Sequence, residues 1–588
     1  MSFKSYEQNQ LQIPMQWEFM IEKEHVARVV NDVVEQMNLD TILETYSPLG
    51  QSSFNPKMML KILMYGYIKK RYSSRLIAEG VKSDIYFIWL AGGNKPTRNV
   101  INDFRKDKMK LIIEDVFAEL LLILEQKGDI DLKDYFVDGT KMEANANKYS
   151  FVWKTAVEKN REKLQKKVHD LMNEIDKLND EEDELYPDKE ESEKKEITPE
   201  ELKEFAKRLS DKLNQTSKES KTKEEKQKDK KISKAVKQID KDYLPRLEKY
   251  NKDLEIIGSN RNSYSKTDKD ATFMHMKEDH MRNGQLKPGY NVQVGTNNEF
   301  IVNWSIHQDR SDYETLIPHL ERLEKLTKKL PENLGADSGY GNEKNYEYLR
   351  SRKIKNYVKY TYFHLEQKSS FKKKIYNWQN MHYDEINDEF TCPQGKKLKY
   401  VVTKNERAQA GYNQEIRIYE CSDCSKCPCK SECTKSEYNR KIRFNKNLWK
   451  FKNHVRKNLL SKKGIQMRAN RAEYSERVFA QIIWNMGFKR FMLRGLKKVD
   501  IEFGLLSIAF NIKKMHKKEI QKAKEIACQM VNSANELIKT KIPAISHWNF
   551  CFRVPILGHP RCRTAMLKSV NCNFTTFIYL TQLHLFHL

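Results

Sequence analysis

The sequence predicts an α/β protein preceded by an all-helical N-terminal domain, and three observations lead to this expectation. Apolar residues recur at helical spacing within the first 125 residues. Two short apolar runs, residues 135–137 and 334–336, each end at an aspartate that a glycine follows within two positions. Beyond residue 286, strand patterns alternate with helix patterns, and this order is typical of α/β folds.

Residues 1–125 have the pattern of short helices separated by glycine turns. Residues 58–68 carry a broad apolar face, and a last helix is expected over residues 99–107 with Arg98 and Arg105 beside it. The pattern fits a helix-turn-helix-like module in which these two arginines contact DNA. A plain structural helical bundle explains the same pattern.

The first strand is predicted to stop at Asp138. Tyr135, Phe136 and Val137 favour β structure, and Asp138-Gly139 is a turn dipeptide. An acidic side chain at the end of a buried strand is where a metal-dependent enzyme would place a ligand. The alternative is an ordinary turn aspartate, because Asp-Gly is among the commonest turn signals.

Residues 155–262 form a charged insertion with helical periodicity. Apolar residues step by four and three through residues 164–178 and again through residues 236–257, which predicts an antiparallel, coiled-coil-like helical hairpin. Residues 217–233 contain almost no hydrophobic residue and are predicted to be mobile. We interpret the insertion as a solvated arm, with a role in dimerisation or DNA contact as the alternative.

The strand pattern returns after the insertion. Residues 289–295 and 299–307 predict a hairpin, a helix follows, and a second short strand ends at Asp337. A further helix and a strand over residues 356–360 complete the α/β pattern.

Asp138 and Asp337 would repel each other in one site unless a cation neutralised them. Carboxylate oxygens suit Mg²⁺ or Mn²⁺, and two such ions roughly 3.5–4 Å apart assist phosphoryl transfer. Two ions need a third acidic ligand, for which we select Glu476 on a predicted helix. Glu473 competes for this role, and a surface glutamate is the plain alternative.

The chain is strongly basic. Lys and Arg number 107 against 81 Asp and Glu, giving a net charge of +26. An excess of this size favours a polyanionic partner, nucleic acid first, although a lysine-rich bias without a partner is the alternative. The polar N-terminus resembles no signal peptide, and no run approaches the roughly 18 apolar residues of a membrane helix. We therefore expect a cytoplasmic protein with no membrane partner.

Six of the ten cysteines fall between residues 392 and 433. In a reducing compartment this grouping favours metal binding over disulfides, and the spacing is typical of a zinc knuckle. Metal-free thiols are the alternative, and the sequence does not select four ligands. The last stretch, residues 541–588, contains no acidic residue, and we interpret it as a tail from a shifted or extended reading frame.

The blocks around these residues resemble the DDE insertion-sequence transposases of bacteria, whose catalytic core is RNase H-like. The resemblance covers roughly residues 15–520 and rests on four blocks in the family's order: FNPKMMLKILMYGYIKKRYSSRLIAEG through PTRNVINDFRKD, FVDGTKMEANANKYSFVWK, GADSGYGNEKNYEYL, and RAEYSERVFAQIIWNMGFKRFMLRG.

The resemblance implies a catalytic triad of Asp138, Asp337 and Glu476 that holds two Mg²⁺ or Mn²⁺ ions. It also suggests Cys392, Cys421, Cys424, Cys427 and Cys433 as zinc ligands, with Cys429 additional. Related helices often carry a lysine seven residues after the glutamate, where this chain has Ile483. Lys489 and Arg490 are expected to supply charge to phosphate instead. Tyr340 is a candidate for stacking on a distorted base, with a role as a core aromatic as the favoured alternative.

The resemblance further implies strand cleavage at the inverted-repeat ends of an insertion sequence, then attack of the freed 3′-OH on target DNA. The expected partner is double-stranded DNA, bound by a homodimer at the nucleoid. The alternatives are a decayed or repurposed DNA-binding protein and a nuclease that cleaves without joining.

These inferences divide the chain into seven parts, which are an N-terminal DNA-binding domain (1–125), three parts of an RNase H-like catalytic core (130–154, 263–362 and 446–538), the helical insertion (155–262), a small Cys-rich β insertion (363–445) and the atypical tail (539–588).

Overall fold

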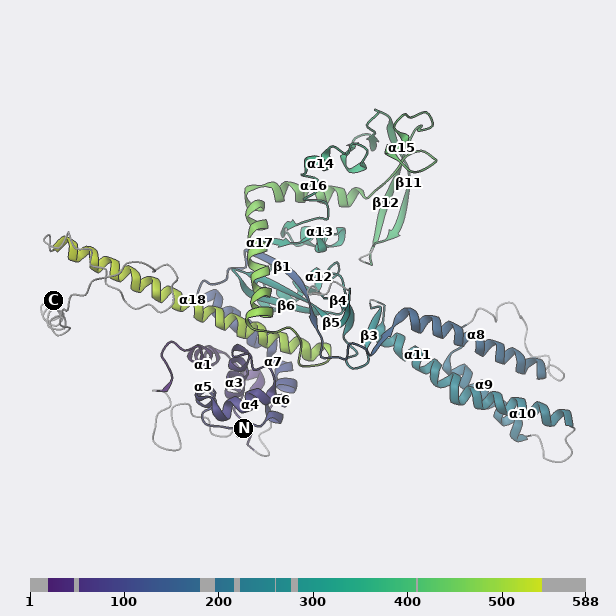
Figure 1. Ribbon diagram of the computed structural model, residues 1–588, viewed down its shortest axis with the longest axis horizontal. Coiled ribbons are helices and arrows are strands. Elements are labelled where there is room, and N and C mark those ends of the chain that lie inside the picture. Colours follow the sequence, from purple (N-terminus) through teal and green to yellow (C-terminus); the bar gives the residue numbers. More distant parts are fainter. Residues whose placement is uncertain are drawn as a thin grey trace. The chain divides into compact units, whose positions relative to one another are not determined.

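The computed structural model (Figure 1) describes residues 20–46, 52–179, 196–215, 223–259, 261–276, 284–408 and 411–541. The chain divides into two compact units, Met1–His516 and Lys517–Leu588, and the elements described below belong to the first unless stated. The predicted tail after Lys541 lies outside the described residues. Within the part that the structure describes, no helix is both long and apolar enough to cross a membrane.

The N-terminal region is helical, as predicted. Its helices are α1 (Val26–Gln36), α2 (Asp40–Leu43), α3 (Pro56–Ile68), α4 (Ser74–Ser83), α5 (Ile85–Leu90), α6 (Arg98–Asp103), the π-helical turn η2 (Phe104–Lys108) and α7 (Met109–Gln126). The side chain of Asn55 caps α3 by accepting the N–H of Lys57 at 2.8 Å. Every residue of α3 from Met58 to Ile68 is buried, since this helix is apolar on most sides. Its buried Lys61 pairs with Glu35 of α1.

A mixed sheet follows the helices. Its strands are β1 (Asp134–Glu143), β4 (Thr272–His275), β5 (Leu286–Asn297), β6 (Phe300–His307), β7 (Asn333–Ala336) and β8 (Lys355–Val358). The order is β4-β5-β1-β7-β8, with β6 also paired to β5. β1 is antiparallel to β5 and parallel to β7, and β7 is parallel to β8. The predicted mixed α/β fold is thereby confirmed.

The first strand does not stop at Asp138, and the sequence prediction was wrong on this point. β1 continues to Glu143 because β5 keeps pairing with it from Gly139 onward. Pairing with β7, however, ends at Phe136. Asp138 therefore lies at the end of the parallel pairing rather than at the end of the strand.

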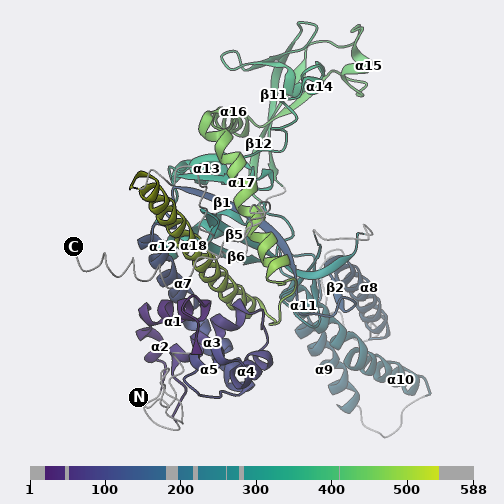
Figure 2. The same ribbon diagram turned by 60° about the vertical axis from the view of Figure 1, so that its left-hand side comes forward.

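Helices cover both faces of the sheet. Tyr135 and Phe136 point to opposite faces because side chains alternate along a strand. Tyr135 Oη lies 2.8 Å from His319 Nε2 on α12 (Leu316–Thr327), and the Phe136 ring meets Tyr474 on α17 (Lys462–Ala480) at 5.6 Å. Hence α12 and α17 lie on opposite faces, which Figures 1 and 2 show together.

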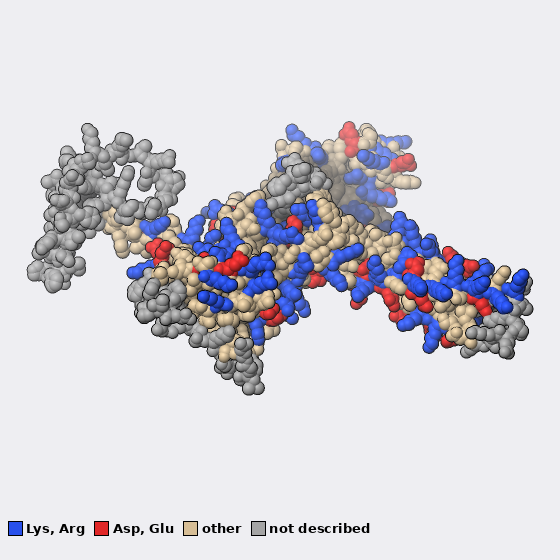
Figure 3. Space-filling view, turned by 60° about the horizontal axis from the view of Figure 1, so that its bottom comes forward, with Lys and Arg blue, Asp and Glu red and all other residues tan. Residues whose placement is uncertain are grey.

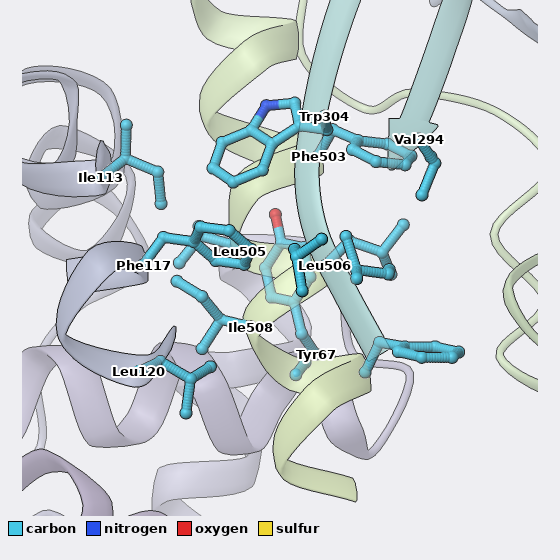
Figure 4. Packing of buried hydrophobic residues seen from close by; sticks show 14 of the residues in the cluster. Tyr67, Ile113, Phe117, Leu120, Val294, Trp304, Phe503, Leu505, Leu506 and Ile508 are labelled. Atoms are coloured by element: carbon cyan, nitrogen blue, oxygen red, sulfur yellow. The ribbon is translucent and has the colours of Figure 1, made fainter. Parts of the chain in front are cut away.

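The beginning of α18 (Leu496–Lys541) lies on the same face as α17. Val294 pairs with both Asp138 and Trp304, so these three side chains share one face. Trp304 is fully buried there and meets Phe117 of α7 edge to face at 4.7 Å. In Figure 4, α7 residues face Trp304 and the α18 ribbon.

The insertion after β1 has its own small core. It contains β2 (Phe151–Trp153), α8 (Lys154–Asn179), α9 (Pro199–Gln215), α10 (Lys223–Gln238), the π-helical turn η4 (Ile239–Tyr243), α11 (Leu244–Ile257) and β3 (Ser263–Ser265). β2 pairs with β3, so the chain leaves and re-enters through one ladder. The predicted mobile segment 217–233 is helical from Lys223 onward, and residues 217–222 lie outside the described residues. Figure 3 shows basic and acidic side chains mixed over these helices.

The Cys-rich segment forms a separate five-stranded sheet. Its strands are β9 (His382–Asp384), β10 (Glu389–Thr391), β11 (Lys397–Arg407), β12 (Asn413–Cys421) and β13 (Lys441–Phe444). Each strand pairs with the next one along the chain. The short elements α14 (Ser369–Lys372), the 3₁₀ turn η6 (Trp378–Asn380) and α15 (Lys430–Cys433) accompany these strands along the chain. In the mixed sheet, α13 (Glu343–Ser351) connects β7 to β8. The helix α16 (Lys446–Leu460) leads from β13 to α17, and the π-helical turn η7 (Gln481–Asn485) follows α17.

The contact between α18 and the sheet depends on Gly504. A Cβ added there would lie 2.6 Å from Ile113 Cγ1 and 2.7 Å from Trp304 Cζ2, both in the buried core. We expect Gly504→Ala to lower the free energy of unfolding by about 1–3 kcal/mol, because overpacking forces the core apart. Urea denaturation measures this change, with the exposed α18 substitution Lys497→Ala as control. Equal stability of the two variants would contradict the close packing.

Candidate active site

Asp138 and Asp337 follow the point at which the parallel strands β1 and β7 stop pairing. The last paired residues of the two parallel strands are Phe136 and Gly335. Two residues further along each strand stand Asp138 and Asp337, so the parallel register places them opposite each other. Because Asp138 and Phe136 share a face, Asp138 points toward α17.

Backbone N–H groups fix both aspartates. Oδ1 of Asp138, which is 8% exposed, accepts the N–H of Gly139 at 2.9 Å. Asp337 caps the 3₁₀ turn η5 (Ser338–Tyr340), and its Oδ1 accepts the N–H of Gly339 at 2.8 Å. Each carboxylate thus has one oxygen oriented by a backbone N–H one or two residues further along the chain.

Glu476 reaches this region through Arg471. Nη1 of Arg471 lies 3.9 Å from Asp138 Oδ2, and its Nη2 lies 4.0 Å from Glu476 Oε1. The guanidinium is largely buried while the Glu476 side chain is 66% exposed. Glu473 is directed elsewhere, since it pairs with Arg477 at 2.9 Å. Of the two glutamates considered from sequence, the structure brings Glu476 beside Asp138.

Further basic groups surround the carboxylates. Lys359 directly follows β8, and its backbone N–H donates to Ala336 O at 3.2 Å. Burial lowers the pKa of Lys359, Arg471 lowers it further, and Asp337 and Glu476 oppose the shift. These four groups therefore lie within electrostatic reach of one another.

Two residues predicted to contact DNA are buried, and those predictions were wrong. Tyr340 is 0% exposed, and its hydroxyl donates to Gln293 Oε1, so its ring faces no base. Burial, with Asp312 and the two site aspartates nearby, raises the Tyr340 pKa well above its usual range. Arg105 is 3% exposed, because packing draws it inward to donate to Tyr72 O at 2.7 Å.

The other predicted DNA contacts are exposed. Arg98 opens α6 at the surface. Lys489 is exposed, and its ammonium lies 4.1 Å from the centroid of the exposed Trp484 ring. Arg490 binds its own protein instead, donating to Ala144 O at 3.1 Å and to Ala146 O at 3.2 Å. Its guanidinium thereby holds the segment that follows β1.

The carboxylates supply the hard oxygen donors that Mg²⁺ and Mn²⁺ prefer. Asp138 and Asp337 both lie two residues beyond the last paired residues of the parallel strands β1 and β7. Within the residues that the structure describes, however, no group of three or more His, Cys, Asp or Glu side chains is close enough to hold an ion. Glu476 is held off by the guanidinium of Arg471.

The clustered cysteines form a second candidate site. A small cavity is lined by Cys392, Cys421, Cys424, Cys427, Cys429 and Cys433, together with Tyr376 and Arg440. Burial raises the pKa of the Cys421 thiol to about 11, and the neighbouring Cys424 adds to the shift. Cys433 is affected in the same direction by burial and by three other cysteines. The spacing predicted a common location, and the fold brings the six residues to one cavity.

Sequence reasoning missed three residues of the aspartate site. Lys359 follows a short strand and carries no motif. Asp312 stands in a loop before α12, and only tertiary contacts bring it near Gly139 and Gly339. Arg468 is one helical turn before Arg471, so the two arginines share a face of α17. The i, i+3 spacing of these two arginines ahead of Glu476 was the sequence signal that could have identified Arg468.

Two family models match the chain. A transposase domain (DUF772) matches residues 15–107, and a transposase DDE domain matches residues 391–516. No curated protein and no solved structure matches it. The second match contains Glu476 and the clustered cysteines, whereas Asp138 and Asp337 precede it in the chain.

A buried glutamate on α18 supports the loop after Arg490. Glu502 is 0% exposed and accepts the N–H groups of Met492 and Leu493 at 2.9–3.1 Å. Burial raises its pKa to about 7 from the usual 4.5, and the backbone N–H groups and Arg105 oppose the shift. Glu502 thus binds a proton more tightly in the folded chain than in the unfolded chain.

This raised pKa predicts a pH dependence of stability. As pH rises from about 4.5 to about 7, the unfolded chain loses the Glu502 proton first, so folding is progressively disfavoured. We expect Glu502→Gln to flatten the decline of Tm over this range, since glutamine accepts the same N–H groups without a charge. Thermal denaturation across the range measures it. Glu321→Gln, an exposed α12 substitution, is the control, and identical pH profiles for the two variants would refute the assignment.

Proposed function

Since the chain belongs to the insertion-sequence DDE transposases by its two family matches, we propose that it cleaves and joins DNA strands at the inverted-repeat ends of its own element. The observation that carries this proposal is the placement of Asp138 and Asp337 just beyond the end of the β1–β7 pairing, with Glu476 on the helix covering the face toward which Asp138 points. The sheet order, with three antiparallel strands followed by two parallel ones, supports an RNase H-like core.

Asp138 and Asp337 would hold divalent Mg²⁺ or Mn²⁺ ions, with Glu476 completing the set. The ions would supply charge neutralisation and activation of the attacking oxygen. The backbone N–H bonds to each aspartate orient one oxygen in advance, so the protein's contribution is positioning rather than covalent chemistry.

The arginines of α17 are suited to the DNA backbone. Nε of both Arg468 and Arg471 is buried without a hydrogen-bond partner among the described residues. Guanidinium groups bind phosphate through paired N–H donors. For Glu476 to approach Asp138, the Arg471 guanidinium must leave its place between them, and a DNA phosphate would receive it. Substrate entry and site assembly would then be coupled.

The proposed partner is double-stranded DNA, contacted by exposed basic residues that include Arg98 and Lys489. The net charge of +26 supports this partner. A homodimer would hold the two element ends together in the active complex.

A decayed DNA-binding protein of the same descent is the second candidate. Arg471 between Asp138 and Glu476, and Ile483 in place of the family lysine, favour it. Measurement of DNA cleavage distinguishes the two candidates, because only an active transposase needs the three carboxylates for its activity.

Charge-removing substitutions at the triad test the enzyme. We expect Asp138→Asn, Asp337→Asn and Glu476→Gln each to slow Mg²⁺-dependent strand cleavage of element-end DNA by at least about 100-fold, because several kcal/mol of transition-state stabilisation are lost. Gel analysis of cleaved and joined products measures it, with Glu473→Gln as the matched control on α17. If the wild-type protein cleaves DNA no faster than Asp138→Asn, the transposase activity is contradicted and the decayed DNA-binding protein is favoured. Cleavage without joined products would indicate a nuclease.

We also propose that the cysteine cavity holds a structural zinc ion, using four of Cys392, Cys421, Cys424, Cys427 and Cys433. Thiolates in tetrahedral sets are typical zinc ligands. The separate sheet β9–β13 has a small core of its own, so metal binding would contribute to its folding.

Elemental analysis tests the zinc site. We expect about one zinc per chain in protein purified under reducing conditions, loss of that zinc in Cys424→Ser, and a lower Tm for this variant or after chelation. Cys528→Ser, at an exposed position on α18, is expected to retain the metal. Zinc-free wild-type protein with an unchanged Tm on chelation would show metal-free thiols.

A further inference from the structure

Asp312 lies in the loop between β6 and α12. Its side chain forms hydrogen bonds to β1, the strand that contains Asp138, and to the neighbouring strand β5. Its Oδ1 accepts from Asn291 Nδ2 at 2.7 Å and from Gln293 Nε2 at 2.9 Å, both on β5. Lys141 of β1 donates to the same oxygen at 3.5 Å. One carboxylate from a loop thus ties β1 to β5 beside the candidate site.

These contacts lie on the face of the sheet opposite to the Asp138 side chain. Gly139 pairs with Gln293, and directly opposed residues of an antiparallel pair project to the same face. Asp138 precedes Gly139 and so projects to the other face, toward α17. Asp312 therefore supports the strands from the face opposite to the Asp138 carboxylate and is not placed to share a ligand with it.

The glycines that follow the two aspartates, Gly139 in β1 and Gly339 in η5, both lie close to this carboxylate. A Cβ at Gly139 would lie 2.6 Å from Gln293 Nε2 and 3.1 Å from Asp312 Oδ1. A Cβ at Gly339 would lie 3.1 Å from Asp337 Oδ1 and 3.6 Å from Asp312 Oδ2. The glycine after each aspartate thus leaves the space in which Asp312 and Gln293 approach the backbone.

Hydrogen bonds continue from Asp312 to the turn that carries Asp337. The Gln293 amide donates to Asp312 through Nε2, and its Oε1 accepts the hydroxyl of Tyr340. Tyr340 is the last residue of η5, the turn that Asp337 caps. The chain Asp312–Gln293–Tyr340 therefore joins the backbone beside Asp138 to the backbone beside Asp337.

We propose that Asp312 is a positioning residue that sets the separation of the Asp138 and Asp337 carboxylates through Gln293 and Tyr340. The inference rests on the proposed function, because the separation matters for holding a divalent ion between the two aspartates. Asp312 touches neither ion nor DNA; its effect passes through the hydrogen-bond chain.

The test compares Asp312→Asn, Tyr340→Phe and the double variant in the full-length protein. Each change keeps the size of the side chain, Asp312→Asn removing the charge and Tyr340→Phe only the hydroxyl. Three quantities are measured: Mn²⁺ affinity from the paramagnetic resonance of the free ion, the single-turnover cleavage rate on element-end DNA, and DNA affinity in the absence of metal. Glu321→Gln on the exposed face of α12 is the matched control.

We expect Asp312→Asn to weaken Mn²⁺ binding and slow cleavage by about 10-fold, as loss of supporting hydrogen bonds does at metal sites. DNA affinity in the absence of metal stays at the wild-type value, as does every quantity for Glu321→Gln. Tyr340→Phe shifts Mn²⁺ affinity in the same direction by a smaller factor. The double variant matches Asp312→Asn, because residues in one chain are not additive.

Wild-type Mn²⁺ affinity in Asp312→Asn would overturn the proposal, and so would multiplicative effects in the double variant. A loss of Tm that accounts for the slower rate, with unchanged Mn²⁺ affinity, would show a merely structural role. Wild-type protein that binds Mn²⁺ without cutting DNA would contradict the proposed transposase activity alone, and the Mn²⁺ comparison would still decide the role of Asp312. Wild-type protein that binds no Mn²⁺ would overturn both.

Discussion

The unequal pairing along the two edges of β1 is the constraint on which the candidate site depends. β5 pairs with β1 from Phe136 to Glu143, whereas β7 pairs only as far as Phe136. Beyond that point β1 continues to pair with β5, whereas the segment that follows β7 turns at Asp337 into η5. The carboxyl ends of parallel strands are where α/β sheets bind ligands. The two aspartates follow the ends of this parallel pairing, and α17 covers the face toward which Asp138 points.

Charge balance around the two aspartates follows from the same geometry. Asp138 is almost fully buried, and burying a carboxylate without a partner is costly. The N–H of Gly139 and the guanidinium of Arg471 provide that partnership from the protein itself. A cation that took over this role would release Arg471 toward another anion, and Glu476, exposed and 4.0 Å from the same guanidinium, would be free to approach. Arg471 therefore links the state of the aspartates to the state of Glu476.

The sequence predicted those parts of the site that depend on local pattern. The apolar runs before Asp138 and Asp337 correctly marked two strands of one sheet, and helical spacing placed Glu476 on a helix. The Asp-Gly dipeptide misled the prediction of the end of β1, because pairing with β5, 150 residues away along the chain, overrides a local turn signal. Arg105 was assigned to DNA from the helix-turn-helix-like pattern, and Tyr340 was considered for base stacking beside the alternative of a core aromatic, yet tertiary packing buries both. Asp312 and Lys359 have no local signature, since only the fold brings them near the aspartates.

The two insertions explain how so long a chain can keep one precise site. The helical insertion leaves after β1 through the β2–β3 ladder and buries its apolar seam, Leu164 to Leu247, in a core of its own. The Cys-rich segment likewise packs a separate core around Phe390 and Tyr419. Neither core shares residues with the one that contains Phe136 and Trp304. The apolar cores of the two insertions are therefore separate from the core under β1, β5 and β7, the strands that surround Asp138 and lead to Asp337.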